Sequence, residues 1–528
     1  MGCALNIDLY PFQVDGVNWV SRRIGEGFYW TPVFMETGTG KTPVAFKVIE
    51  EWISLGRRKF VVVCPMNVVG NWVDEAAKFH VPLVVQRVHS KQSAYSREQL
   101  MLSSRWDLLI INYDTMRNLK RVLIDIPIDG IIFDEVQRLK NKQAGQTQAA
   151  REIVLAHKRQ GMGRLGLSGT PAPKSPLDHW SIFDVLDPYP DATNYKHHPL
   201  GYGSYRSFEQ NICTKEAHPR LKGVYKYFFP PLMIAELQRR IQFHAFEAFK
   251  EDVLPWLPDQ RFQKVYVDMT PEQEKLYNLV RDEAVATLKG AEFDRRDLAL
   301  ADIMPLAQWM EEAAEARDLA IKAGKKPRDL MAELQQGLVS ATMQTVVLIR
   351  LHQIACGHVT LADGKTRMFG GGKIDYITEE LSKWTDEFLD NKVIIFTAFR
   401  ADVKQLVEVC EKQNIGFVTL TGDNSSEAQE AVNSFQKDPK VRVFICNLAA
   451  GSSGITLTAA NRVCWYSSTY NWEHRRQSMD RPHRIGQTRP VLYTDLMIRN
   501  SMEQYVLRNL EEKKTLARMT TSKFMSIL

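Results

Sequence analysis

A short run of glycine, lysine and threonine near the start of the sequence has the composition of a phosphate-binding loop. Residues 38–42, Gly-Thr-Gly-Lys-Thr, follow the apolar stretch 32–34 and open a helical pattern at 43–55. Glycines let backbone N–H groups turn toward phosphate oxygens, and the N-terminus of the following helix adds partial positive charge. Lys41 is expected to reach the β and γ phosphate oxygens, and Thr42 to offer its hydroxyl to Mg2+. The residues expected to contact a nucleotide here are Gly38, Thr39, Gly40, Lys41 and Thr42.

Two adjacent carboxylates, Asp134 and Glu135, directly follow the apolar stretch 130–133. Ligands of an open parallel sheet bind beyond the carboxyl ends of its strands, so this position is expected beside the phosphate loop. Asp134 is expected to hold Mg2+, directly or through water, and Glu135 to orient and deprotonate the attacking water. An Asp-Glu pair at a strand end is by itself more often a helix cap, but its combination with a phosphate loop favours catalysis. The sequence therefore predicts ATP and Mg2+ as cofactors, with Thr42 and Asp134 as metal ligands.

These residues need a rigid sheet to hold them, and short apolar runs that alternate with helical patterns occur in two regions. The runs cover residues 60–64, 108–112 and 131–133 in the first region, and 393–396, 441–446 and 463–466 in the second. They are too uniformly apolar for a sheet with one solvated face and are typical of parallel strands covered by helices on both faces. The predicted fold is therefore α/β, with two doubly wound parallel-sheet lobes.

Residues 272–345 separate the two regions and are rich in Ala, Glu, Leu, Arg and Met. No glycine and a single proline occur between 291 and 323, which predicts helices. Their charges alternate in sign, which is more often a solvated face than a binding site. The predicted domains are a first lobe at 1–190, a helical insertion and inter-lobe region at 191–345, and a second lobe with a C-terminal helix at 346–528.

Composition excludes several other classes of protein. Of the 528 residues, 44% are hydrophobic and 25% are charged, which is the balance of a folded chain with more than one core. The net charge of +6 permits a polyanionic partner without requiring one. No apolar run approaches the length of a membrane helix, and Asn6 stands where a myristoylation signal needs Ser or Thr. No membrane contact is expected.

The cysteines indicate a reducing environment. Seven are scattered along the chain without a Cys-x-x-Cys pair, so neither a disulfide framework nor a zinc ribbon is indicated. His352, Cys356 and His358 lie close together in sequence, but a structural zinc site needs a fourth ligand. We therefore predict no structural metal.

The most specific pattern in the sequence runs from Gln477 to Gln487 and reads Gln-Ser-Met-Asp-Arg-Pro-His-Arg-Ile-Gly-Gln. It closely resembles the sixth motif of the SWI/SNF-type ATPases within helicase superfamily two. Other segments are similar to further motifs of that family in the same order: 10–13 to the adenine-reading glutamine motif, 64–72 to the motif after the phosphate loop, 167–171 to the third motif, 370–374 to the start of the second lobe, 393–396 to the fourth motif and 451–458 to the fifth. The resemblance covers nearly all of residues 8–510, and the helical insertion aligns only by position.

The resemblance implies an ATP hydrolase with two RecA-like lobes that moves along nucleic acid. ATP is expected between the lobes, with Gln13 reading the adenine and Gln477 contacting the nucleotide. Arg481 and Arg484 are expected to reach the γ-phosphate as arginine fingers, because a planar guanidinium stabilises charge spread over phosphoryl oxygens. The alternative for these arginines is the exposed, solvated start of a basic helix.

The resemblance favours double-stranded DNA as the track, held mainly through its phosphates. The alternative function is a strand-separating DNA or RNA helicase of the same superfamily, and a non-enzymatic scaffold is disfavoured because the expected catalytic residues are present. The protein is expected to act as a monomer on DNA in replication, recombination or repair. It is expected in the cytoplasm, as a bacterial or viral protein, or in the nucleus of a eukaryote.

Four features depart from the family pattern, besides Met35, which stands where the full phosphate-loop motif has its first glycine. The loop 35–42 reads Met-Glu-Thr-Gly-Thr-Gly-Lys-Thr where the family usually has two acidic residues followed by Met-Gly-Leu-Gly-Lys-Thr, and Gln137 stands where the second motif usually has histidine. These two changes occur in other superfamily-two motors, so ATP hydrolysis is still expected, but they weaken the likeness to chromatin remodellers. Ala449 replaces an arginine early in the fifth motif, which puts one backbone contact in question, and Trp472 replaces a proline before the sixth.

Overall fold

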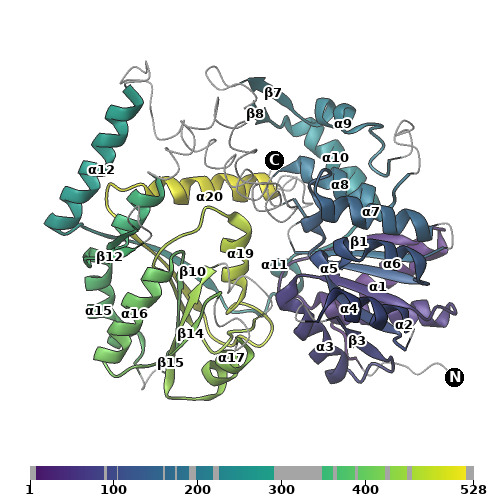
Figure 1. Ribbon diagram of the computed structural model, residues 1–528, viewed down its shortest axis with the longest axis horizontal. Coiled ribbons are helices and arrows are strands. Elements are labelled where there is room, and N and C mark those ends of the chain that lie inside the picture. The colour runs from purple at the N-terminus through teal and green to yellow at the C-terminus, as the bar shows by residue number, and fades with distance from the viewer. Residues whose placement is uncertain are drawn as a thin grey trace. The chain divides into compact units, whose positions relative to one another are not determined.

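The computed structural model describes residues 7–88, 92–103, 105–158, 161–169, 171–172, 175–189, 198–217, 225–289, 348–360, 365–386, 390–422, 428–448 and 455–518. The chain divides into two compact units (Figure 1). The first unit consists of residues 1–257, 484–486 and 513–528, and the second of residues 258–483 and 487–512. Each unit is built around its own large sheet.

The first unit contains a seven-stranded sheet in which all neighbouring strands are parallel. From one edge to the other, the strands are β3 (Val85–Arg87), β4 (Leu108–Asn112), β2 (Phe60–Cys64), β5 (Gly130–Asp134), β6 (Gly163–Ser168), β1 (Trp30–Met35) and β9 (Phe246–Ala248). The five central strands are buried along their whole length. This burial explains the apolar runs of β2, β4 and β5, because both faces of the sheet need apolar side chains.

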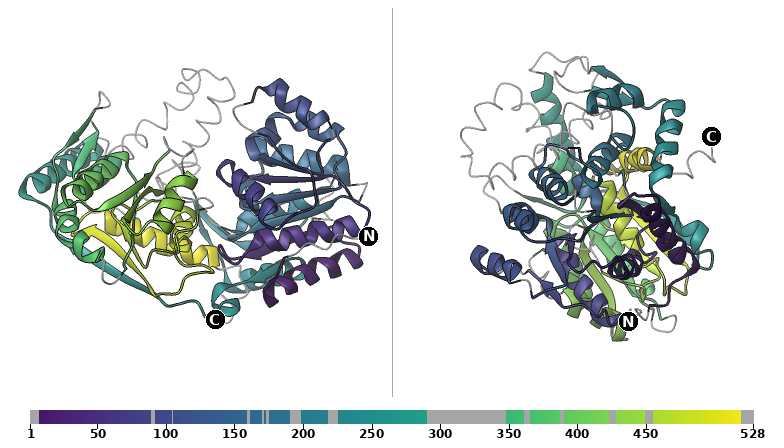
Figure 2. Two further views of the ribbon diagram at one scale, coloured as in Figure 1. Left: turned by 90° about the horizontal axis from the view of Figure 1, so that it is seen from below. Right: turned by 90° about the vertical axis from the view of Figure 1, so that its right-hand side faces the viewer.

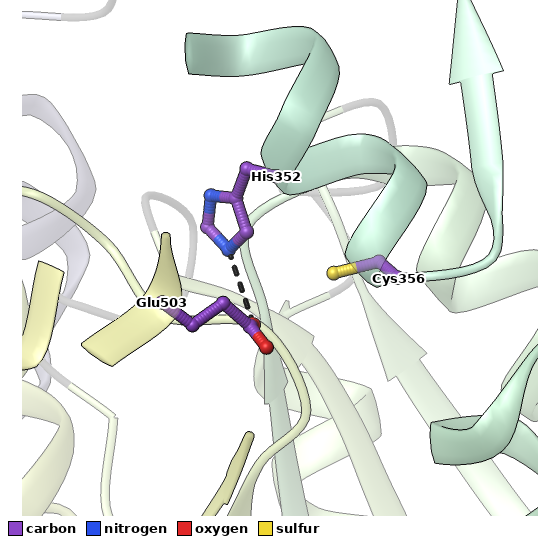
Figure 3. A group of neighbouring side chains, drawn as sticks. All are labelled: His352, Cys356 and Glu503. Carbon is purple, nitrogen blue, oxygen red and sulfur yellow. Dashed lines mark ion pairs between the residues drawn. The ribbon is translucent and has the colours of Figure 1, made fainter. Parts of the chain in front are cut away.

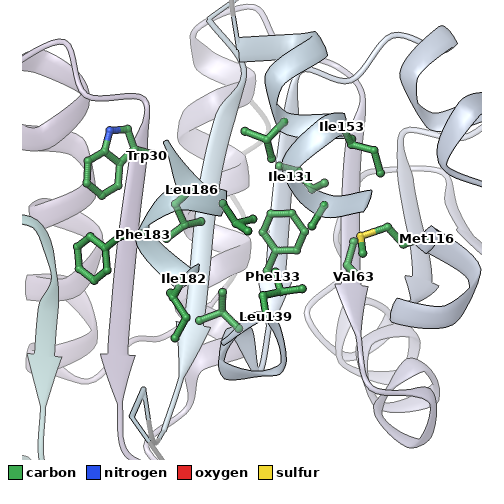
Figure 4. Close-up of a cluster of buried hydrophobic side chains, with 14 of the residues drawn as sticks. Trp30, Val63, Met116, Ile131, Phe133, Leu139, Ile153, Ile182, Phe183 and Leu186 are labelled. Atoms are coloured by element: carbon green, nitrogen blue, oxygen red, sulfur yellow. The ribbon is translucent and has the colours of Figure 1, made fainter. Parts of the chain in front are cut away.

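Helices cover both faces of this sheet (Figure 2). Along β2, Val61 and Val63 pack into one hydrophobic core while Phe60, Val62 and Cys64 pack into the other, because side chains alternate between the faces of a strand. Each fully buried side chain of this kind contributes about 1.5–3 kcal/mol. The first core, whose centre is shown in Figure 4, is completed by α4 (Ala94–Leu102), α5 (Tyr113–Asn118), α6 (Lys120–Asp125), α7 (Gly145–Lys158), α8 (His179–Leu186), α9 (Tyr205–Ile212) and α10 (Pro231–His244). The second core is completed by α1 (Pro11–Gly25), α2 (Lys41–Ser54), α3 (Val69–Lys78) and α11 (Lys250–Val253).

Short elements complete the first unit. An antiparallel hairpin is formed by β7 (Thr214–Ala217) and β8 (Tyr225–Phe228). Three single-turn helices are η1 (Met66–Val68), η2 (Val136–Leu139) and η3 (Pro176–Asp178). Since η2 begins two residues after β5, it turns the chain sharply at the carboxyl end of that strand.

The second unit contains a six-stranded sheet, again with parallel neighbours throughout. Its strands in spatial order are β10 (Gln260–Val267), β17 (Val491–Ile498), β16 (Arg462–Trp465), β13 (Val393–Thr397), β15 (Val441–Asn447) and β14 (Gly416–Leu420). One hydrophobic core includes α15 (Gly372–Trp384) and α16 (Arg400–Lys412), and the other includes α17 (Ala428–Lys437). The unit also holds α12 (Pro271–Lys289), α19 (Trp472–Asp480), the start of α20 (Glu503–Arg518) and a hairpin of β11 (His358–Thr360) and β12 (Thr366–Met368).

The predicted α/β fold with two parallel sheets is confirmed, and β2 and β4 have the predicted bounds. The boundary between the compact units falls at residues 257 and 258, inside the segment 191–345, because β9 completes the first sheet while β10 belongs to the second. Most of the predicted helical insertion, residues 290–347, lies outside the described residues, so it stays a prediction. Among the helices that the structure describes, none has the length and apolar character needed to span a membrane.

Candidate active site

Three neighbouring strands of the first sheet, β5, β6 and β1, end at the same edge because they run parallel. The strand β1 leads into the phosphate loop, β5 ends at Asp134, and β6 between them ends at Ser168. Segments that lie far apart in the sequence are thereby brought together at one edge. Parallel α/β sheets bind their ligands at this edge.

The phosphate loop adopts the backbone conformation that its glycines permit. Gly38 and Gly40 have φ values of 87° and 82°, in the left-handed region that residues with a Cβ rarely adopt. Gly40 is the N-cap of α2, so that helix begins at Lys41, as the phosphate-loop reading requires. The Lys41 ammonium donates to the carbonyl oxygen of Met35 at 3.2 Å, which holds the side chain beside its own loop.

Gln13 joins α1 to the phosphate loop. Its Nε2 donates to the carbonyl oxygens of Thr39 at 2.8 Å and Gly40 at 3.4 Å, while its Oε1 accepts from the backbone N–H of Tyr10 at 2.9 Å. A Cβ at position 40 would displace this Nε2, and the φ of 82° at Gly40 also favours glycine. Gln13 therefore lies at the predicted site, and its contacts fix the shape of the loop.

Gly169, which follows β6, approaches the phosphate loop closely from the other side. A Cβ at this position would lie 2.6 Å from Thr37 Oγ1, 2.9 Å from the Thr37 backbone nitrogen and 3.4 Å from Lys41 Nζ. Two of these distances are shorter than real Cβ contacts allow. The absence of a side chain at Gly169 therefore permits the third motif to touch the loop.

Asp134 is buried and is held by three different donors. The Glu135 N–H donates to Asp134 Oδ1 at 3.0 Å, the Trp72 indole Nε1 donates to Oδ2 at 2.9 Å, and the Tyr113 hydroxyl donates to the Asp134 carbonyl oxygen at 2.8 Å. Burial, followed by the nearby charge of Glu135, raises the pKa of Asp134 to about 6, although the Trp72 donor and the charge of Lys41 act in the opposite direction. A carboxylate in such a site gains most from a nearby cation.

Glu135 lies at a strained turn and is the first residue in a series of hydrogen-bonded side chains. Its φ of 53° and ψ of 52° are left-handed, which is uncommon for a residue other than glycine and is characteristic of functional sites. Gln137 Nε2 donates to Glu135 Oε2 at 2.5 Å, and Ser168 Oγ donates to Gln137 Oε1 at 2.7 Å. The amide of Gln137 therefore links the carboxylate expected to act as base to the third motif.

The oxygen ligands and the loop backbone of the first unit are suited to bind Mg2+ and a triphosphate. The Asp134 carboxylate and the Thr42 hydroxyl are hard oxygen ligands of the kind that Mg2+ prefers. The positive-φ glycines at 38 and 40 leave the backbone of the loop uncovered by any Cβ, as close approach of phosphate oxygens requires. Burial raises the pKa of Glu75 on α3, although a hydrogen bond with Thr42 acts in the opposite direction.

The residues of the sixth motif lie in and after α19. Gln477 donates to Glu473 Oε1 at 3.4 Å within the helix. Arg481 is buried, its Nη1 donates to the Ile455 carbonyl oxygen at 3.3 Å, and its own carbonyl oxygen accepts from the Leu457 N–H at 3.1 Å. A solvated basic helix start therefore does not describe Arg481. The catalytic roles of Gln477, Arg481 and Arg484 stay predictions, and residues 449–454 of the fifth motif, with Ala449, lie outside the described residues.

A family model described as the SNF2-related domain matches residues 12–318, and a model of the helicase conserved C-terminal domain matches residues 372–486. The chain belongs to the SNF2-related family. This membership confirms the resemblance seen in the sixth motif and implies ATP hydrolysis. With the two parallel sheets, it also confirms the predicted pair of RecA-like lobes.

Curated relatives of this SNF2-related chain are distant but align over nearly all of it. It is 24% identical to TATA-binding protein-associated factor mot1 of Aspergillus fumigatus, to lymphoid-specific helicase of Homo sapiens and to the ISWI chromatin-remodeling complex ATPase ISW1 of Saccharomyces cerevisiae, over 97%, 97% and 96% of its length. The chain spans only 26%, 62% and 40% of those proteins. Among solved structures, the SWI2/SNF2 ATPase core of Sulfolobus solfataricus in complex with dsDNA is 23% identical, with a TM-score of 0.41, and the match covers 98% of this chain and 93% of that one.

The second unit of the SNF2-related chain contains a buried polar cluster formed by His352, Cys356 and Glu503, whose ligand atoms lie within 4.8 Å of one another (Figure 3). His358, which is close to His352 and Cys356 in sequence, is not part of this cluster: its Nε2 lies 2.9 Å from Asp402 Oδ1. His358 is on the hairpin strand β11, and Asp402 is on α16.

Lys373 contacts the cluster of His352, Cys356 and Glu503 and supplies a positive charge to it. Its buried ammonium donates to Glu503 Oε1 and, at 2.6 Å, to the Tyr466 carbonyl oxygen. Burial tends to raise the pKa of Glu503, but Lys373 and His352 outweigh burial and hold it below the usual value. Burial also raises the pKa of the Cys356 thiol well above its usual value. We interpret the group as a buried ion pair of Lys373 and Glu503.

Four residues at the site of the first unit were not among those predicted from the sequence to carry chemistry: Trp72, Tyr113, Gln137 and Ser168. Three of them stand inside or beside family motifs, which was the available signal. Tyr113 had no such signal, because its hydroxyl reaches the Asp134 carbonyl oxygen only through the pairing of β4 with β2 and of β2 with β5.

Proposed function

We propose that this SNF2-related protein hydrolyses ATP with Mg2+ and uses the energy to move along double-stranded DNA. The observation that carries the proposal is that three features meet at one edge of the first sheet. They are the phosphate loop, the carboxylates of Asp134 and Glu135, and the hydrogen bonds that join Glu135 through Gln137 to Ser168. A residue set for binding phosphate, holding a cation and moving a proton is thereby assembled on one rigid support.

The residues of the first unit divide the work of hydrolysis. The glycine turns at 38 and 40 aim backbone N–H groups at the phosphates, and Lys41 balances their negative charge. Asp134 and Thr42 would hold Mg2+, which when bound neutralises charge on the β and γ phosphate oxygens. Glu135 accepts a proton from the attacking water on a carboxylate oxygen, while Gln137 keeps the other oxygen in place.

Duplex DNA as the track is supported by family membership, by the helicase C-terminal domain model and by the net charge of +6. Related proteins carry the names of a helicase and a chromatin-remodeling ATPase. Gln13 and Gln477 are proposed to contact the nucleotide, and Arg481 and Arg484 to stabilise the transferring phosphoryl group. The second candidate is strand separation, which the same fold and site would also serve.

The test of hydrolysis compares two substitutions. Lys41→Ala removes the charge that grips the phosphates and should weaken ATP binding, whereas Glu135→Gln keeps the shape of the base and should bind ATP without turning it over. Lys47→Ala is the matched control, because Lys47 lies on the same helix in an ion pair with Glu50. Hydrolysis at the parent rate by Glu135→Gln would show that Glu135 is not the base.

The test of the track measures ATPase rates with duplex, forked and single-stranded DNA and with RNA. Duplex DNA of any sequence should stimulate hydrolysis, and the stimulation should fall with salt, because phosphate contacts release counterions. Strand displacement on forked DNA, without stimulation by blunt duplexes, would favour the second candidate. Stimulation by single-stranded RNA alone would reject duplex DNA as the track.

A further inference from the structure

The helix α3 faces the magnesium-binding edge of the first unit through one tryptophan. Trp72 is 1% exposed, and its indole N–H donates to Asp134 Oδ2 at 2.9 Å. Its ring packs against Phe46 of α2, with ring centroids 5.4 Å apart and an angle of 70° between the planes. The ring is thus fixed by packing, and the only polar atom of its side chain is directed at the carboxylate.

A second residue of α3 reaches the other expected magnesium ligand. Glu75 is one helical turn after Trp72, so both side chains lie on the same face of the helix. Thr42, the first-unit hydroxyl expected to bind Mg2+, is hydrogen-bonded to Glu75. One helix face therefore contacts both residues expected to ligate the cation.

The donors around Asp134 leave the carboxylate able to bind a cation. Its Oδ1 accepts from the Glu135 N–H and its Oδ2 accepts from Trp72. Each carboxylate oxygen has two lone pairs, so one on each oxygen stays available. A fixed donor behind a metal ligand restricts its rotation, and removal of such a partner typically lowers metal affinity by about 10- to 100-fold.

We propose that Trp72 is a positioning residue for Mg2+, whose indole N–H orients Asp134 toward the cation. The proposal rests on the proposed function, because it concerns the Mg2+ that accompanies ATP. It goes beyond that function by assigning α3 to the support of the metal site. Trp72 needs to touch neither the nucleotide nor the reacting atoms.

The experiment separates the affinity for Mg2+ from the affinity for nucleotide. Binding of a fluorescent ADP analogue to the full chain is measured in EDTA and then as a function of Mg2+ concentration. The variant is Trp72→Phe, and the matched control is Trp106→Phe, since Trp106 is also 1% exposed and its indole N–H donates at 2.9 Å to the Met101 carbonyl oxygen in the same unit. Benzothienylalanine at position 72 replaces the N–H by sulfur without changing the ring shape, and serves if Trp72→Phe does not fold.

For Trp72→Phe we expect the half-saturating Mg2+ concentration to rise about tenfold or more, with the affinity in EDTA within about threefold of the parent. Trp106→Phe should leave both quantities near the parent values. An unchanged Mg2+ requirement in a folded position-72 variant would overturn the proposal, as would equal losses with and without Mg2+. Failure of the parent protein to bind nucleotide at all would instead reject the proposed function.

Discussion

Gln137 offers the sharpest test of how the active site is organised, because its amide joins Glu135 to Ser168. The residue is fully buried, and its hydrogen bonds to Glu135 and Ser168 measure 2.5 and 2.7 Å. The substitution Gln137→Leu nearly conserves volume and removes both bonds. A hydrogen bond to a charged partner contributes about 1.5–3 kcal/mol, which corresponds to roughly a 10- to 150-fold loss of rate if it acts in the transition state.

The loss should appear in kcat, because Gln137 holds the base and the nucleotide is bound by the phosphate loop. Steady-state ATPase rates at saturating ATP and duplex DNA measure it, with nucleotide affinity measured in parallel. Ser168→Ala removes the bond from Ser168 to Gln137 and keeps the bond from Gln137 to Glu135. It should cost less than about tenfold, since a neutral hydrogen bond contributes about 0.5–1.5 kcal/mol. Gln146→Leu is the control, because Gln146 also donates its amide to a carboxylate, at 3.0 Å from Asp114 Oδ1, on the surface.

A rate for folded Gln137→Leu within twofold of the parent would refute this reasoning, because the amide would then have no influence on the base. Reduced nucleotide affinity with unchanged kcat would refute it as well, since the amide would then act on binding. Circular dichroism and a thermal melt establish folding, because the Ser168 hydroxyl left without its buried partner costs about 1–3 kcal/mol of stability.

Three further outcomes are expected. Arg484→Ala should leave nucleotide affinity within a few-fold of the parent but lower DNA-stimulated turnover by roughly 10³-fold. Arg484→Lys should restore little of this turnover, since the ammonium is a point charge and lacks the planar guanidinium group. Turnover near that of the parent would indicate a solvated arginine. Lys373→Met should lower the free energy of unfolding in urea by about 3–5 kcal/mol, because the buried carboxylate of Glu503 loses its lysine partner. The double variant with Glu503→Leu should regain most of this loss, and additive losses would contradict a buried ion pair. Burial lowers the pKa of His179 and of His198 to about 3. Below a pH of about 6.5 the unfolded chain therefore binds more protons than the folded chain, and the free energy of unfolding should fall as the pH decreases from there. A variant with both histidines replaced by glutamine that keeps the same pH slope would contradict this.

The sequence by itself determined the elements whose signals are local. Continuous apolar runs identified β2 and β4 with their correct bounds, because strands buried on both faces need apolar side chains at every position. The glycines at 38 and 40 and the lysine after them identified the phosphate loop, because the left-handed turns and the helix start depend on neighbouring residues alone.

The tertiary structure decided which side chains support the site. The order of the strands places β2 and β6 on either side of β5, which lets Trp72, on the helix after β2, reach Asp134 and lets Ser168, at the end of β6, reach Gln137. The packing of α15 against the second sheet likewise brings Lys373 into contact with Glu503, which lies 130 residues later in the sequence. Hydrogen-bond partners of this kind depend on strand order, register and helix packing. These are set by burial of the whole chain, so the spacing of residues in the sequence does not predict them.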